Sequence, residues 1–282
     1  MSQQQPPKRS IYPRNGIYGR GAPTTPVMKI RILIPVYRPL PTDGERRAIA
    51  NNVRQLAAYD VAFVAPEGLD MAPYAALAPE AEVVRVGEEW LGSRNGIAGY
   101  NAMMLSERFY RLSEAWDYIL ICHPDAWIFR DEVAAWAARG YDCVAAPWMR
   151  RPVYDLPLVR QYMAWRQRSR HRRGLSCRAD LYGRIGNGGL SLRRTAAFID
   201  ACRRYADRAA EYLAVRSHLY NEDVFWATVP DNFRYPTPEE ALAFAFDTTP
   251  AYCYRLTGGR LPMGCHSWSK PRMYRFWRRF IP

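Results

Sequence analysis

The sequence predicts an α/β fold with a mostly parallel sheet and helices on both faces. Two observations predict it. Short apolar strands alternate with helical segments along the first half of the chain, and several of these strands are ended by proline. With 282 residues, 49% of them hydrophobic, the chain can bury a sizeable core, and we expect one domain over residues 29–282.

The individual elements follow from local patterns along the chain. Residues 29–36 (KIRILIPV) form an apolar run, as expected for a first strand. A helix start at 42–45 (TDGE) leads into an apolar stripe of Ile49, Val53 and Leu56. The same reasoning gives strands at 61–65, 82–86, 118–122, 141–146 and 241–246, helices at 99–112, 131–139 and 195–213, and a turn leading into a helix at 221–228.

Three segments break this alternation. Residues 1–28 are rich in Gln, Pro, Gly and Arg, have no apolar signal-peptide core, and are expected to be a flexible leader. Residues 150–180 are Arg-rich and are expected to form an insertion near the site. From residue 261 the chain is expected to end in a loop and a basic, aromatic C-terminal tail.

Charge is unevenly distributed along the sequence. The net charge is +13, and residues 150–173 hold eight arginines against a single acid, Asp155. Residues 270–279 hold five basic residues and no acid. Such patches suit phosphates, anionic lipid headgroups or acidic glycans, although solvated surface charge would leave the same pattern.

Cysteine spacing and hydropathy indicate the compartment. The six cysteines include no CxxC pair, which argues against a zinc knuckle or a thioredoxin-type motif. No apolar run approaches the roughly 20 residues needed to span a bilayer. We therefore expect reduced thiols and a cytoplasmic location, with peripheral contact at the inner membrane face as a hypothesis.

The segment around Asp125 carries the strongest functional signal. Residues 118–122 (YILIC) form an apolar strand, Asp125 follows, and residues 126–129 are apolar again. An acid between two apolar runs costs free energy unless it is paired, hydrogen-bonded or bound to a cation. At the carboxyl end of a strand, Asp125 stands where a metal–nucleotide site is expected, unless it only caps the following turn.

Three further clusters contain residue types used in binding and catalysis. Residues 185–193 (IGNGGLSLR) place three glycines in four positions, which suits either a close backbone approach to a ligand or a plain tight turn. Glu222 and Asp223 precede an apolar helix start, either as N-terminal helix charges or with one of them as a general base. His266 could share one divalent cation with Asp125.

Together these segments resemble nucleotide-sugar-dependent glycosyltransferases of the A-type (GT-A) fold, and more closely a bacterial glycosyltransferase-like family. The resemblance covers residues 30–268 and includes a GYN segment at 99–101. Five motifs occur in the family's order: D-A-x-x-F-R-D at 125–131, AAPW at 145–148, G-N-G-G-x-S-L-R at 186–193, E-D-x-F-W at 222–226 and G-C-H-x-W at 264–268.

The resemblance implies roles for individual residues. Asp125 matches the last aspartate of an Asp-X-Asp motif and, with His266, would bind a divalent cation, Mn²⁺ or Mg²⁺, on the donor diphosphate. His123 stands where the first aspartate usually occurs and is assigned to the nucleotide-sugar site. The other implied contacts are Pro35, Val36 and Tyr37 with the nucleotide base, Asn101 with the nucleoside and Tyr100 next to it, and Gly188 and Gly189 beside donor sugar and acceptor.

The predicted function is therefore a metal-dependent glycosyltransferase of the hexosyltransferase type. It would move a sugar from a nucleotide-sugar, with UDP as the commonest nucleotide for this fold, to a hydroxyl of a cell-surface polysaccharide or lipid-linked glycan. Asp223 or Glu222 would be the base of an inverting transfer. Two alternatives remain open: a basic nucleic-acid-binding protein, motivated by the charge, and a catalytically silent scaffold, motivated by His123 in place of an aspartate.

Overall fold

A computed structural model describes residues 28–92 and 94–282, so the leader predicted at 1–28 lies outside the described residues apart from Met28. Within this part of the chain the main sheet has six strands in the order β3-β2-β1-β4-β7-β6. The pairs β3-β2, β2-β1 and β1-β4 are parallel, and β7 runs antiparallel to both β4 and β6. The strands are β1 (Ile30–Pro35), β2 (Asp60–Pro66), β3 (Glu82–Val86), β4 (Tyr118–Cys122), β6 (Cys143–Ala145) and β7 (Leu190–Arg194).

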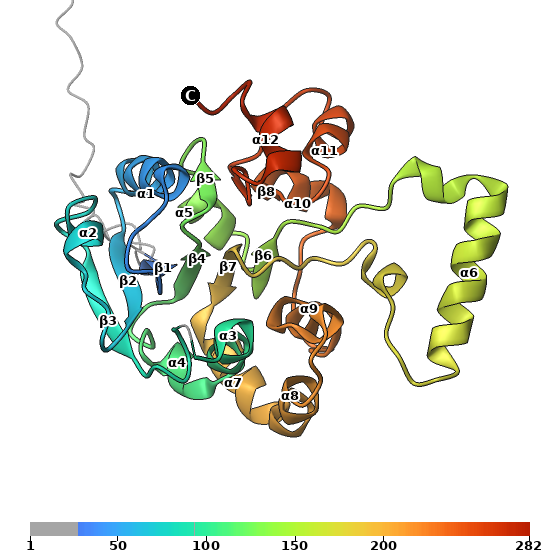
Figure 1. Ribbon diagram of the computed structural model, residues 1–282, viewed down its shortest axis with the longest axis horizontal. Helices are drawn as coiled ribbons and strands as arrows, with labels where there is room; N and C mark the ends of the chain where they lie inside the picture. The colour runs from blue at the N-terminus through green and yellow to red at the C-terminus, as the bar shows by residue number, and fades with distance from the viewer. Residues whose placement is uncertain (1–27, 93) are drawn as a thin grey trace, which may run out of the picture.

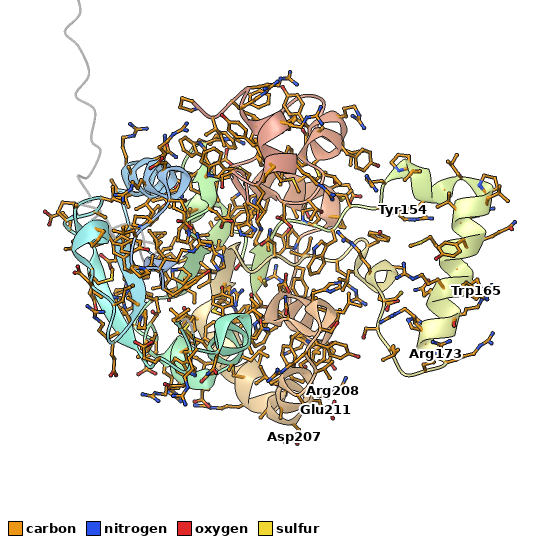
Figure 2. All side chains as sticks on the ribbon, viewed as in Figure 1. Tyr154, Trp165, Arg173, Asp207, Arg208 and Glu211 are labelled. Atoms are coloured by element: carbon orange, nitrogen blue, oxygen red, sulfur yellow. The ribbon has the colours of Figure 1, made fainter. Side chains whose placement is uncertain are left out.

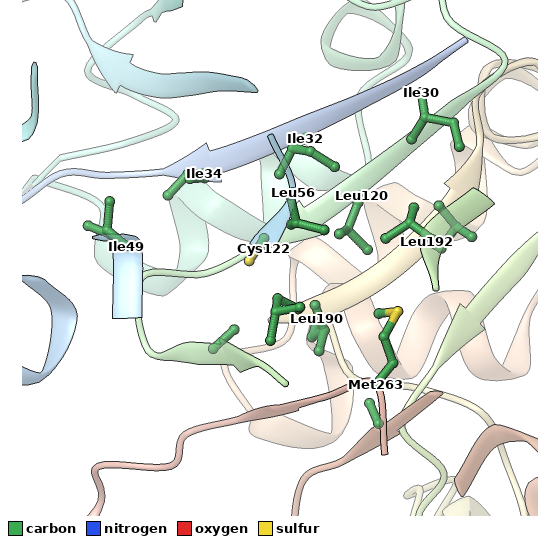
Figure 3. Close-up of a cluster of buried hydrophobic side chains, with 14 of the residues drawn as sticks. Ile30, Ile32, Ile34, Ile49, Leu56, Leu120, Cys122, Leu190, Leu192 and Met263 are labelled. Atoms are coloured by element: carbon green, nitrogen blue, oxygen red, sulfur yellow. The ribbon is translucent and has the colours of Figure 1, made fainter. Parts of the chain in front are cut away.

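Helices cover both faces of this sheet, which confirms the predicted α/β class (Figure 1). Alternate residues of β1 point to opposite faces: Ile30, Ile32 and Ile34 enter one core cluster, and Leu33 enters the other. Figure 3 shows the first cluster between the sheet, α1 and the segment of Met263. One face carries α1 (Asp43–Gln55), α2 (Ala72–Ala75), α5 (Val133–Ala137) and α10 (Pro238–Phe244), and the other α3 (Gly96–Met104), α4 (Glu107–Arg111), α7 (Thr195–Arg204), α8 (Ala206–Leu213) and α9 (Glu222–Thr228).

A second, three-stranded sheet joins segments that are distant in sequence. Its order is β5-β9-β8, with β5 (Ala126–Ile128) antiparallel to β9 (Gly264–His266) and β8 (Ala245–Phe246) parallel to β9. The pairing places Ala126 opposite His266. Asp125, which precedes β5, and Asp247, which follows β8, are therefore brought next to His266 at the end of β9, and this is how the site described below is assembled.

Two buried asparagines of α1 hold β5 in place. The side chain of Asn52 donates to the carbonyl of Ala126 (2.9 Å) and accepts from the amide of Ile128 (2.9 Å). Asn51 donates to the Ile128 carbonyl (2.8 Å). Because a short strand inside a protein must have its backbone groups paired, these amides take the place of a neighbouring strand on that side of β5.

Three elements differ from the sequence-based expectation. The helix predicted at 99–112 is two helices, α3 and α4, separated at Leu105–Ser106, and the helix predicted at 195–213 divides at Tyr205 into α7 and α8. The strand predicted at 241–246 is wrong for its first four residues, which belong to α10. A capping box explains the helix: Thr237 accepts from the amide of Glu240 (3.2 Å), and the Glu240 carboxylate accepts from the amide of Thr237 (2.9 Å).

Residues 150–180 leave the body of the molecule as an arm (Figure 1). The arm consists of a short 3₁₀ turn at Pro152–Asp155, the helix α6 (Pro157–His171) and a second 3₁₀ turn at Arg178–Leu181. Figure 2 labels Tyr154 near its attachment, Trp165 on α6 and Arg173 just beyond the end of that helix. The predicted C-terminal loop and tail contain the helix α12 (Pro271–Trp277), which packs against α11 (Pro250–Leu256).

All six cysteines are buried as free thiols. Among residues 28–92 and 94–282, every helix is too short or too polar to cross a bilayer.

Candidate active site

A pocket of about 390 Å³ opens at the carboxyl ends of β1 and β4. Residues that follow β1 form one wall, and the connection from β4 to β5 forms another. The apolar strands end here, so the loops that carry polar groups begin at this edge. Of the residues that the sequence assigns to a nucleotide-sugar or metal site, Pro35, Val36, Tyr37, Tyr100, His123, Asp125 and His266 line this pocket.

His123, Asp125 and His266 converge at this pocket. Each offers one ligand atom, and the three atoms lie within 4.8 Å of one another. The closest pair is Nε2 of His266 and Oδ1 of Asp125, at 3.1 Å. The hydroxyl of Tyr100 lies 2.7 Å from Nε2 of His123 and orients that ring. Two imidazoles and one carboxylate are ligands that divalent transition metals accept, so the donor set fits such a cation.

The charges at this cluster are strongly coupled. Burial alone would lower the pKa of His266, but the carboxylates of Asp125 and Asp247 raise it to about 10. Burial would raise the pKa of Asp125, but the neighbouring His266 outweighs it and holds that pKa well below its usual value. Burial and the charge of His266 lower the pKa of His123 to about 3, so its ring is neutral at pH 7. A metal cation would take the place of the proton on His266.

Asp247 is a site residue that the sequence analysis did not identify. Its Oδ1 atom lies 3.3 Å from Nδ1 of His266, while Nε2 of the same ring faces Asp125. A carboxylate on the far nitrogen fixes the ring and its tautomer, as is usual for histidines that bind metals. A signal was available: Asp247 directly follows the apolar run 241–246, just as Asp125 follows an apolar strand.

The glycines at 188 and 189 are required by close packing beside this cluster. A Cβ atom on Gly189 would overlap the imidazole of His266, and one on Gly188 would overlap the carboxylate of Glu222. The carbonyl of Gly189 also accepts from the amide of His123 (2.8 Å). Gly188 and Gly189 therefore let the catalytic candidates approach one another, and neither lines the 390 Å³ pocket.

Glu222 and Asp223 are adjacent in sequence but occupy different environments. Glu222 is 2% exposed, and its Oε2 atom lies 3.0 Å from Nη2 of Arg193, itself 2% exposed. Burial alone would lower the pKa of Arg193, but the Glu222 carboxylate raises it, so Arg193 remains a cation. Asn101 accepts from the amide of Glu222 (3.1 Å) and lies outside the pocket lining. Glu222 is thus held inside the protein.

Asp223 borders a second cavity of about 970 Å³, on the side of the arm. Burial, with a further contribution from the charge of Glu222, raises the pKa of Asp223 to about 7. The amide of Val224 donates to its Oδ1 atom (2.9 Å), which fixes the side chain. A carboxyl group that titrates near neutral pH beside an open cavity can accept a proton from a bound molecule. Lys270 lines both this cavity and the 390 Å³ pocket, so the two are adjacent.

Comparison with protein-family profiles shows which family this chain belongs to. The profile of a family described as "Protein of unknown function (DUF5672)" matches residues 80–266 of the 282, which include the candidate cluster and both acids. The chain belongs to the DUF5672 family. Among curated proteins, none matches it.

Solved structures establish the fold. The DUF5672 protein is similar to the galactosyltransferase LgtC in complex with donor and acceptor sugar analogs, with a TM-score of 0.52 and 13% identity over 88% of this chain and 99% of that one. It is also similar to mouse xyloside xylosyltransferase 1 in its apo form, with a TM-score of 0.51 and 13% identity over 87% of this chain and 98% of that one. The mixed α/β architecture is that of GT-A glycosyltransferases, as the sequence resemblance implied.

Proposed function

We propose that this DUF5672 protein is a metal-dependent glycosyltransferase that moves a sugar from a nucleotide-sugar to an acceptor hydroxyl. The observation that carries the proposal is the convergence of His123, Asp125 and His266 at a pocket on the carboxyl edge of β1 and β4. Nucleotides bind at this edge in open α/β sheets. The GT-A-like fold supports the same conclusion, since LgtC with its sugar analogs shares it.

The 390 Å³ pocket is proposed as the donor site. Residues 35–37 offer a wall for the nucleotide base, and the hydrogen-bonded pair Tyr100 and His123 lines the same pocket as Asp125. A divalent cation held by His123, Asp125 and His266 would neutralise the negative charge that develops on the departing diphosphate. Lys270 is exposed, and its ammonium group donates to the Ser267 hydroxyl (2.7 Å), so it is available to the same diphosphate.

Asp223 is proposed as the general base. The acceptor hydroxyl gives its proton to the Asp223 carboxylate while its oxygen bonds to the anomeric carbon of the donor sugar. The bond from that carbon to the diphosphate breaks, and the nucleoside diphosphate leaves. Asp223 fits this role better than Glu222, because Asp223 borders the cavity beside the donor pocket and Glu222 is paired with Arg193. A base on the acceptor side supports an inverting displacement.

The ligand set favours Mn²⁺ over Mg²⁺. Mg²⁺ prefers oxygen ligands in near-ideal octahedral geometry, whereas imidazole suits first-row transition metals. Here two of the three candidate ligands, His123 and His266, are imidazoles. We expect calorimetric titration of the protein with each ion to give at least tenfold tighter binding of Mn²⁺. His123→Asp should narrow that difference, and equal affinity for the two ions in the unaltered protein would contradict the preference.

A panel of nucleotide-sugars, with and without Mn²⁺, tests the proposed function through release of free nucleoside diphosphate. UDP-sugars are the first to try. We expect Mn²⁺-dependent release from one donor, and its loss in Asp125→Ala. If no donor in the panel released its nucleoside diphosphate and none produced a thermal shift, the proposal would be contradicted and a catalytically silent scaffold favoured. Tight, steeply salt-dependent binding to RNA or DNA in its place would favour a nucleic-acid-binding protein.

Peripheral contact with an anionic membrane is proposed for the arm. On α6, Leu158, Tyr162 and Trp165 follow one another at four and three residues, and they are 80%, 56% and 60% exposed. The arginines at 160, 166 and 168 lie on the same exposed helix. A helix with apolar and aromatic side chains beside arginines suits the headgroup region of an anionic bilayer.

Sedimentation with vesicles tests the membrane contact. We expect the protein to sediment with phosphatidylglycerol vesicles and to remain in solution with phosphatidylcholine vesicles. Replacing Trp165 and Tyr162 by serine should abolish sedimentation, whereas Arg208→Gln on α8 (Figure 2) should not. Undiminished sedimentation of the arm variant would contradict the proposal.

A further inference from the structure

The 970 Å³ cavity has a wall built from three parts of the chain. Its residues come from both connections of the arm, at 148–154 and 178–182, from the segment 218–224, and from residues 248–255 and 270–276 in and around α11 and α12. Asp223 lies in the lining beside the N-terminus of α9. The two arm connections are held together by Tyr154 and Tyr182, whose rings stack with centroids 5.5 Å apart. The base of the arm is therefore one side of this cavity.

The lining is strongly cationic. Five basic side chains contribute to it: Arg151, Arg178, Arg255, Lys270 and Arg272. Among the residues lining it in the described part of the chain, Asp223 is the one carboxylate. Within residues 28–92 and 94–282, none of the five cations forms an ion pair with an acid. Elsewhere on the surface arginines do find acidic partners, for example Arg208 with Glu211.

Aromatic rings are interleaved with these cations. Trp148, Tyr154, Tyr182 and Tyr252 all line the cavity. Rings offer flat faces for the apolar side of a sugar, and planar guanidinium groups bind phosphate or carboxylate oxygens in pairs. The combination suits a molecule that has both a sugar ring and an anionic group.

The position of the cavity beside the donor pocket indicates the role of the bound sugar. Lys270 belongs to this lining and to that of the proposed donor pocket, and Asp223 lines the cavity. A sugar bound among the aromatic rings would therefore present a hydroxyl to Asp223 while its anionic group lies against the arginines.

We propose that the 970 Å³ cavity is the acceptor site and that it selects an acceptor sugar carrying a phosphate or a carboxylate. This inference rests on the proposed glycosyltransferase function and adds the chemical class of the acceptor. The cationic wall formed by Arg178, Arg255 and Arg272 supplies the selectivity, and a neutral sugar would leave those charges without partners.

Acceptor selectivity can be measured with the donor identified from the panel. Four acceptors are compared: a methyl hexoside, the 1-phosphate of the same hexose, the matching uronate, and the hexose phosphate on a short polyprenyl chain. We expect kcat/KM for at least one anionic acceptor to exceed that of the methyl hexoside by tenfold or more, the order expected for a charge-assisted hydrogen bond. Comparing the two phosphate-bearing acceptors distinguishes a preference for a free sugar phosphate from a preference for a lipid-linked one.

Variants locate the selectivity. Arg178→Gln and Arg272→Gln should each reduce the ratio of kcat/KM for anionic over neutral acceptors by about tenfold. Arg208→Gln, on the exposed face of α8, is the matched control and should leave the ratio unchanged. A ratio near one in the unaltered protein, or a ratio insensitive to both variants, would overturn this inference while leaving donor turnover intact. Failure of every donor to release its nucleotide would overturn the proposed function itself, and this inference with it.

Discussion

The adjacent acids Asp223 and Glu222 should respond in opposite ways to replacement by their amides. The folded protein raises the pKa of Asp223 from 3.8 to about 7, mainly through burial. At 1.36 kcal/mol per pKa unit, keeping this carboxylate ionised above pH 7 costs about 4 kcal/mol of stability. A partly buried amide has its own desolvation cost, so we expect Asp223→Asn to raise the free energy of unfolding by about 2 kcal/mol at pH 8.

The sign of the pH dependence follows from the raised pKa. The stability contributed by Asp223 is fully present below its unfolded value of 3.8 and is lost as pH rises to about 7. At pH 5 the raised pKa of Asp223 lowers the free energy of unfolding by less than half as much as it does at pH 8. The stabilisation by Asp223→Asn should therefore shrink between pH 8 and pH 5. Turnover with acceptor should fall at least 100-fold, because the proposed base is absent.

Glu222→Gln should lower the free energy of unfolding and leave most of the turnover intact. It leaves the guanidinium of Arg193 buried without its carboxylate partner, at a cost of about 3–5 kcal/mol. Turnover per folded molecule should fall by less than tenfold, since Glu222 does not border the acceptor cavity. Urea unfolding at pH 5 and pH 8 gives the stabilities, and nucleoside diphosphate release with acceptor gives turnover. A Glu222→Gln variant that loses turnover but keeps its stability would refute this division of roles.

Three further predictions concern the same site. Gly189→Ala should weaken Mn²⁺ binding at least tenfold in calorimetry, because the added Cβ overlaps the ring of His266. The control Gly68→Ala, whose Cβ meets a flexible carboxylate at 3.2 Å, should bind Mn²⁺ normally. Equal Mn²⁺ affinities of the two variants would count against the metal site. The rate of transfer should rise with pH through about 7 and then level off as Asp223 loses its proton, and a flat profile would exclude it as base. The product should have the anomeric configuration opposite to that of the donor by NMR, and retention would contradict the inverting displacement.

The parallel half of the fold could be predicted from sequence because its signals are local. The strands at 29–36, 61–65, 82–86 and 118–122 are short apolar runs, and each occurs in the structure within a few residues of its predicted bounds. The segment 241–246 is an apolar run like a strand, but the capping box of Thr237 and Glu240 just before it makes most of it helical. Here the helix start was the stronger local signal, and it lay outside the window that suggested a strand.

The site could be predicted only where a motif marks it. Asp125 and His266 were paired from their motifs, and the structure brings them to 3.1 Å. Asp247 and Arg193 were not identified, because their contacts with His266 and Glu222 join segments that are distant in sequence. The apolar run before Asp247 marks its position at the end of a strand but does not indicate its partner. Pairing of β5 with β9 depends on the folded chain as a whole, and sequence spacing does not reveal it.

Anomalous X-ray diffraction from crystals grown with Mn²⁺ and UDP would show directly whether His123, Asp125 and His266 hold a metal ion beside a bound nucleotide. We expect one manganese peak within coordination distance of His123, Asp125 and His266, with the diphosphate beside it and the base against residues 35–37. Ordered UDP in another part of the molecule, or manganese bound away from these three side chains, would contradict it.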